Sequence, residues 1–163
     1  MATFANIKKV RLAIDDPPGF VDLISVATSS TLPASPKHQT AYYVVDDDEY
    51  RATDVTVVAT PADYEVLDLR VSDERIGDWI DSDGVYDARV YALRDITRKL
   101  GQELALVRTQ SGAESNEYNA LLDTYKYYKG LISDAEKEAQ VESLNSSGRL
   151  LSTTAPEIAG GNL

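Results

Sequence analysis

The densest cluster of side chains that could do chemistry is the acidic run Asp46-Asp47-Asp48-Glu49. Calcium prefers oxygen ligands, so such a run could in principle hold a hard cation. The run lacks the spacing of an EF-hand loop, with its central glycine and distal glutamate. We therefore expect a solvated hairpin turn. A metal-dependent carboxylate enzyme built on this cluster is a less favoured alternative.

Other catalytic groups are scarce in this chain. It has one histidine, His38, and no cysteine, which excludes disulfide scaffolds, thiolate zinc sites and sites with two histidines. His38 stands in a polar stretch without a nucleophile motif, and the pair Asp81 and Asp83 is typical of a helix end or loop. We predict that the protein is not an enzyme and uses no catalytic residue, metal or cofactor.

The charge balance restricts the partners. The 163 residues include 16 Lys and Arg against 27 Asp and Glu, a net charge of -11. Proteins that bind duplex DNA gain affinity when Lys and Arg displace counterions from phosphates. This acidic composition therefore argues against a protein that binds duplex DNA. It is compatible with a protein that surrounds DNA without gripping it. No apolar run approaches the roughly 20 residues that cross a bilayer, and the start does not resemble a secretory signal. We expect a protein made in the cytoplasm without membrane contact.

Hydrophobic spacing predicts the elements that would position these groups. Apolar residues at intervals of three and four predict a helix over residues 4–14, which an Asp-Asp-Pro-Pro-Gly segment ends. β-Branched and aromatic residues then favour strands, with a Ser/Thr/Pro-rich loop at 28–36. The predicted strands are 21–26, 42–45, 50–53, 55–59 and 64–69. A small antiparallel sheet is the simplest arrangement of these strands.

The remainder of the chain is predicted to be helical. Ser72 is a favourable N-cap for a short helix that ends near residues 81–84. Two long amphipathic helices follow, over residues 85–107 and 115–141, and a short connection makes such a pair antiparallel neighbours. The predicted fold class is α+β, a helical bundle with an inserted antiparallel β-sheet. Its organisation is a helical core (1–20 and 70–142), an inserted β-rich segment (21–69) and a flexible C-terminal tail (143–163).

Several side chains fall outside the apolar stripes of the two long helices. Tyr127 and Leu131 project away from the stripe of the last helix, and Tyr91, Arg94 and Arg98 share the non-core face of the helix before it. Protein interfaces are enriched in aromatic residues and arginine, so these five residues are candidate subunit contacts. The alternative is a solvated face in which Tyr91 lies over the arginine stems.

Short motifs in the helical part resemble a known family, the head–tail connector proteins of tailed bacteriophages, also called adaptor or head-completion proteins. The match covers roughly residues 4–16 and 70–140. It rests on Val10-Arg11-Leu12-Ala13-Ile14-Asp15-Asp16, Ser72-Asp73-Glu74-Arg75-Ile76, Asp83-Gly84-Val85-Tyr86 with its Ala- and Leu-containing helix, and the helix from Leu121-Leu122 to Glu138. The sequence departs from the family in about fifty extra residues with strand character and in a shorter loop at 109–114.

The resemblance implies a structural protein of the virion neck. Such proteins form a ring, commonly a dodecamer, that docks beneath the portal protein after DNA packaging and extends the DNA channel toward the tail. The implied partners are copies of the chain itself, the portal protein, the next neck or tail-completion protein, and DNA that passes without specific binding. Family C-terminal segments often reach the portal, which makes Arg149, Leu150 and Leu151 candidate portal-docking residues. An acidic regulatory or DNA-mimic protein that binds a basic partner through residues 46–49 is the alternative.

Overall fold

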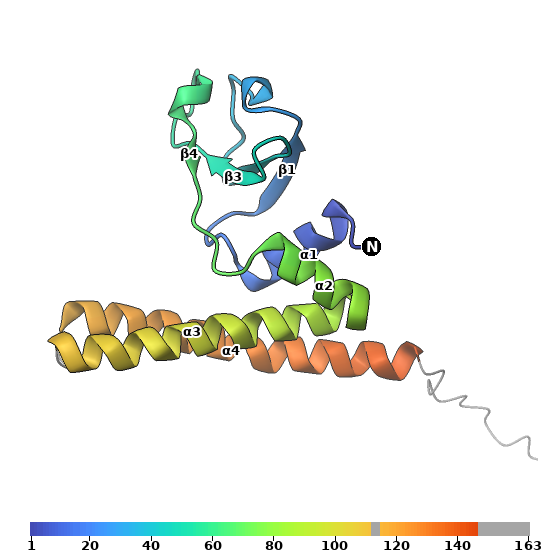
Figure 1. Ribbon diagram of the computed structural model, residues 1–163, viewed down its shortest axis with the longest axis vertical. Coiled ribbons are helices and arrows are strands. Elements are labelled where there is room, and N and C mark those ends of the chain that lie inside the picture. Colours follow the sequence, from blue (N-terminus) through green and yellow to red (C-terminus); the bar gives the residue numbers. More distant parts are fainter. Residues whose placement is uncertain (112–114, 147–163) are drawn as a thin grey trace, which may run out of the picture.

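The computed structural model describes residues 1–111 and 115–146. It has the α+β fold that the sequence predicts: two long antiparallel helices form one layer, a small sheet lies at the opposite end, and two shorter helices stand between them (Figure 1). The elements in chain order are α1 (Phe4–Ile14), β1 (Asp22–Val26), η1 (Ser29–Thr31), β2 (Thr40–Val44), β3 (Glu49–Ala52), η2 (Pro61–Asp63), β4 (Glu65–Val66), α2 (Asp73–Asp83), α3 (Val85–Ser111) and α4 (Asn116–Ser146).

Capping residues mark the ends of the two short helices. Thr3 caps α1 by accepting a hydrogen bond from the Asn6 backbone N–H, and Ser72 caps α2 by accepting one from Arg75 N–H. Such caps satisfy backbone donors that have no partner in the first turn. Helix α2 ends at Asp83, and its capping residue Gly84 has a φ of 91°, a conformation that glycine adopts without steric cost.

The sheet has the order β1-β2-β3-β4 and is mixed. Its β2–β3 and β3–β4 pairs are antiparallel, whereas β1 and β2 run parallel, with Asp22 opposite Thr40 and Val26 opposite Val44. The prediction of an antiparallel sheet is therefore wrong for one pair. The physical reason is that residues 27–39 cross back over the sheet, as parallel pairing requires a long connection.

The β-rich segment packs on both faces of its sheet. One face rests on α1, where Phe4 stacks on Tyr43 at a ring-centroid distance of 5.3 Å. Loop residues cover the other face, and there Tyr64 meets Tyr42 edge-on and its hydroxyl donates to the Pro33 carbonyl at 2.6 Å. Residues 55–59, predicted as a strand, belong to this covering layer, because Val55 and Ala59 turn onto the sheet face.

The main hydrophobic core lies where α1 and α2 meet the hairpin of α3 and α4. Its centre is α3, on which Leu93, Ile96 and Leu100 are fully buried. Helix α4 contributes Tyr128 and Ala135, which lie on one face of the helix, seven residues apart. This helix continues to Ser146, so the predicted tail boundary at residue 143 is too early.

A buried ionic cluster joins the helices to the sheet, and we call it the Arg11 junction: Arg11, Asp16, Tyr50 and Asp73. The Arg11 side chain is fully buried at the end of α1, where its guanidinium pairs with Asp73 and with Asp16, the latter at 3.2 Å. Tyr50 of β3 lies under the guanidinium at 4.8 Å, and its hydroxyl donates to Asp73 at 2.8 Å. The junction thus ties α1, β3 and the start of α2 together.

The junction also fixes the chain that enters α2. Arg11 donates to the Val71 carbonyl at 2.9 Å, and the Asp16 carboxylate accepts the backbone N–H groups of Arg70 and Val71, each at 3.2 Å. Burial raises the pKa of Asp16, an effect that these N–H groups and Arg11 oppose. Segments on either side of the inserted sheet are therefore held at one point.

Candidate functional site

The predicted interface residues of α3 lie on an exposed face. Arg94 and Arg98 expose 58% and 56% of their side chains, and Tyr91 is half-buried. Both guanidinium groups have partners within the chain, because Arg94 donates to Glu136 at 2.7 Å and Arg98 donates to Asp95 at 2.8 Å. An exposed ion pair such as Arg94–Glu136 contributes about 1 kcal/mol or less, so a neighbouring carboxylate can replace Glu136 at low cost, whereas the partner of Arg98 is the buried Asp95.

A buried carboxylate, Asp95, organises this face. Besides Arg98, the Arg75 guanidinium of α2 and the Lys99 ammonium each lie 3.3 Å from one of its carboxylate oxygens. Burial raises the pKa of Asp95, but the hydrogen bond from Arg98 and the nearby charges of Lys99 and Arg75 outweigh it, so the pKa is lowered. Sequence reasoning missed this carboxylate, although its spacing of three and four residues from two cations was a visible signal.

We call Arg75, Arg94, Arg98 and Lys99 the α2–α3 basic patch. These four cations pair with only two carboxylates, Asp95 and Glu136. The result is a cationic surface on a chain whose net charge is -11. Aromatic rings border the patch: the Arg75 guanidinium lies 5.0 Å from the centre of the Trp79 ring, and Trp79 meets Tyr91 edge-on. A surface of this kind can bind carboxylate groups of another chain.

We expect Asp95→Asn to lower the free energy of unfolding at pH 7 and to have a smaller effect at pH 3. The folded pKa of Asp95 lies below the unfolded value of about 4, so its ionised form stabilises the fold above that value. This stabilisation is lost as the pH falls through the folded pKa. Chemical denaturation of both proteins at the two pH values measures the difference.

The matched control for this change is Asp134→Asn, because Asp134 exposes 68% of its side chain and pairs with Lys137 on the surface of α4. We expect little change in stability at either pH for this variant. An equal loss at pH 7 and pH 3 for Asp95→Asn would show that the charge of Asp95 contributes nothing.

The two predicted interface residues of α4 differ in their surroundings. Tyr127 exposes half of its side chain, and its hydroxyl donates to the Asp15 carboxylate at 3.1 Å. Leu131 is half-buried and packs against the main core. The prediction that Leu131 lies off the apolar stripe is therefore wrong, because position 131 shares a helix face with Tyr128 and Ala135.

The acidic run forms the turn between β2 and β3, as the sequence predicts. Arg51 neutralises part of it, with Glu49 at 2.9 Å and Asp47 at 3.3 Å, and the Tyr43 hydroxyl donates to Asp48 at 2.7 Å. Burial and the Asp48 carboxylate raise the pKa of Tyr43 to about 12. Across the described residues, no group of three or more His, Cys, Asp and Glu side chains could hold a metal ion.

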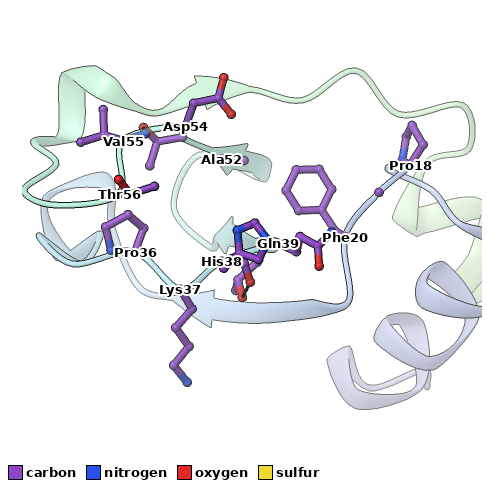
Figure 2. A pocket seen from close by; sticks show the side chains of 13 residues that line it. Pro18, Phe20, Pro36, Lys37, His38, Gln39, Ala52, Asp54, Val55 and Thr56 are labelled. Atoms are coloured by element: carbon purple, nitrogen blue, oxygen red, sulfur yellow. Dashed lines mark hydrogen bonds between the residues drawn. The ribbon is translucent and has the colours of Figure 1, made fainter.

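A pocket of about 420 Å³ lies between the loop that precedes β2 and the chain that follows β3 (Figure 2). His38 and Gln39 lie near Phe20, whereas Lys37 points away. The ionisable residues of its lining are Lys37, His38 and Asp54, all exposed, and neither serine nor cysteine lines it. Three threonines also line it, but the Thr40 hydroxyl donates to the His38 backbone carbonyl and the Thr53 hydroxyl accepts from the Val55 N–H, so neither is paired with the His38 ring as a nucleophile with its base would be.

The predicted portal-docking residues, Arg149, Leu150 and Leu151, lie outside the described residues. No protein family, no curated protein and no solved structure matches the chain. Among the helices of residues 1–111 and 115–146, none is long and apolar enough to cross a membrane.

Proposed function

We propose that the protein is a structural subunit of the phage neck, an adaptor ring that docks on the portal after DNA packaging and extends the DNA channel to the tail. One observation carries the proposal. Two of the motifs that resemble connector proteins meet in space, because Arg11 of the first motif pairs with Asp73 of the second across 62 positions of sequence. Helices α1 and α2 therefore remain in contact although the inserted sheet lies between them in the sequence.

The distribution of charge supports a ring of identical subunits. The α2–α3 basic patch and the acidic surfaces of the chain are different surfaces, so a contact between them is head-to-tail, and head-to-tail contacts form a ring where the rotation between neighbouring copies closes. In such a ring, Tyr91, Arg94, Arg98 and Tyr127 are the candidate contact residues. The net charge of -11 suits a channel that DNA crosses without binding, since like charge repels phosphate.

The proposed role is mechanical and requires no catalytic residue, metal or cofactor. The partners would be neighbouring copies, the portal protein on one side and the next neck or tail-completion protein on the other. The place of action would be the head–tail interface of the virion.

Native mass spectrometry or light scattering of the protein, alone and mixed with a matched portal ring, tests this proposal. We expect a complex of about twelve copies on the portal, even where the protein alone stays monomeric. A protein that remains a monomer or dimer beside a matched portal would contradict the proposal and favour the acidic regulatory or DNA-mimic function. In that function the 46–49 turn would bind a basic partner.

A further inference from the structure

A groove of about 340 Å³ lies between α2, the start of α1 and β2, and we call it the α1–α2 groove. Helix α1 and strand β2 contribute half-buried apolar side chains, among them Phe4, Ile7 and Tyr43. Helix α2 contributes the exposed carboxylates Glu74, Asp78 and Asp81. The groove therefore offers apolar area beside negative charge, a combination that is complementary to a cationic surface with aromatic rings.

The three exposed carboxylates form a row that the chain itself compensates only in part. Glu74, Asp78 and Asp81 are spaced by four and three residues, so they are neighbours on the surface of α2, where like charges repel. The N-terminal ammonium lies 3.1 Å from Asp81. Glu74 and Asp78 have no ion-pair or side-chain hydrogen-bond partner within residues 1–111 and 115–146. A cation supplied by another molecule would relieve this repulsion.

The opposite excess of charge lies on the other side of the same helix. Ile76 and Ile80 of α2 are buried in the main core. At about 3.6 residues per turn, Arg75 of the basic patch and Asp81 of the groove lie on opposite sides of this buried stripe. One copy therefore cannot bring its own basic patch onto its own groove, and the two surfaces remain available to two different neighbours.

The two surfaces also match in their apolar parts and in the freedom of their charges. Half-buried rings border both, Trp79 and Tyr91 at the patch and Phe4 and Tyr43 at the groove. Within the patch, Arg94 is the cation whose partner is an exposed carboxylate rather than the buried Asp95. Arg94 can therefore exchange its partner at low cost. Its counterpart in the groove is Asp78, which is exposed.

We propose that the α2–α3 basic patch of one copy docks on the α1–α2 groove of a second copy. The inference rests on the proposed function, and it names the surface that receives the patch. Each copy gives one patch and receives one, as a head-to-tail contact requires. Complementary charge brings the two surfaces together and sets their register, and the half-buried rings are covered in the contact.

Charge reversal on either surface tests the contact. We expect Asp78→Arg alone, or Arg94→Glu alone, to reduce ring assembly on the portal by on the order of tenfold or more, because each change places like charges opposite each other. Both side chains are exposed, so circular dichroism and melting temperature should stay unchanged. Native mass spectrometry of the portal complex counts the bound copies.

Mixing the two variants gives the sharper readout. When Asp78→Arg and Arg94→Glu copies alternate around a ring, the new glutamate meets the new arginine at one contact, and the natural Arg94 meets the natural Asp78 at the next. We therefore expect the equimolar mixture to assemble on the portal to near the level of the unmodified protein, with the two variants in equal numbers. A contact within one chain could not produce this rescue.

Matched controls come from the surface of α4 and from the partner of Arg94. Asp134→Arg and Lys126→Glu reverse charges at side chains that are 68% and 63% exposed, and we expect neither to change assembly. Glu136→Gln removes the partner of Arg94 within the chain but leaves Arg94 free to reach a neighbour. We expect full assembly from this variant.

The outcomes separate this inference from the function on which it rests. Rings that form equally with Asp78→Arg or Arg94→Glu, or a mixture that assembles no better than either variant alone, would overturn the docking of patch on groove and leave the connector function standing. Absence of a ring from the unmodified protein beside a matched portal would overturn both.

Discussion

Replacing Arg11 with methionine lowers the free energy of unfolding by about 3–5 kcal/mol, the cost expected when one partner of a buried ion pair is removed. Arg11 is fully buried and pairs with Asp16 and Asp73. Methionine fills much of the same volume but leaves Asp16, itself buried, without its cation. Chemical denaturation followed by circular dichroism measures the loss.

Lys9→Met is the matched control for this change, because Lys9 is exposed on the same helix. We expect its effect to stay within about 0.5 kcal/mol. A further test is Asp73→Asn, which should cost less in the Arg11→Met background than in the unmodified protein, since the pair is already broken. Additive losses would contradict the description of the junction as one coupled unit.

Tyr128→Ala is expected to have the second large effect, a loss of about 3–5 kcal/mol. Tyr128 exposes 2% of its surface in the main core, its hydroxyl donates to the Asp15 carbonyl at 2.9 Å, and the Arg70 guanidinium lies 5.7 Å from the ring centre. It is the point where α4 holds the end of α1. Thermal or chemical denaturation reports the loss, and Tyr128→Phe should cost only about 1 kcal/mol because it keeps the ring.

The neighbouring residue supplies the control. Tyr127→Ala removes a ring of equal size, but this ring is half exposed, and we expect a loss of about 1 kcal/mol or less. A large loss from Tyr127→Ala would mean that its contact with Asp15 is structural, and Tyr127 would then be a weaker candidate for the subunit interface.

The helices could be predicted from local sequence because their signals are local. The intervals of Val10 and Ile14, the Ser72 cap and the stripe through Tyr128 place α1, α2 and α4 closely. The parallel pairing of β1 with β2 could not be predicted, since it depends on the path of residues 27–39. Residues 55–59 have the composition of a strand, and only the tertiary packing of Val55 shows that they form none within the chain.

The candidate site was predictable to a similar extent. Helical spacing places Arg94 and Arg98 on an exposed face, where the structure has them. It could not reveal that Arg75 of another helix joins them, because the contact at Asp95 is between helices. The burial of Arg11 was equally hidden, since one of its partners, Asp73, lies 62 positions away in the sequence.

The hydrogen bonds from Arg70 and Val71 to Asp16 have a consequence for how such a protein could diversify. They hold the two ends of the inserted segment next to each other, so the segment is a loop whose closure is fixed by the helical frame. The entropy of closing a loop rises by only about 0.6 kcal/mol for each doubling of its length. A segment of different length could therefore occupy this position, provided that it covers the face of α1 that carries Phe4 and replaces the contacts of Tyr50 with Arg11 and Asp73. The helical frame would then keep its architecture while the surface formed by the inserted segment changes.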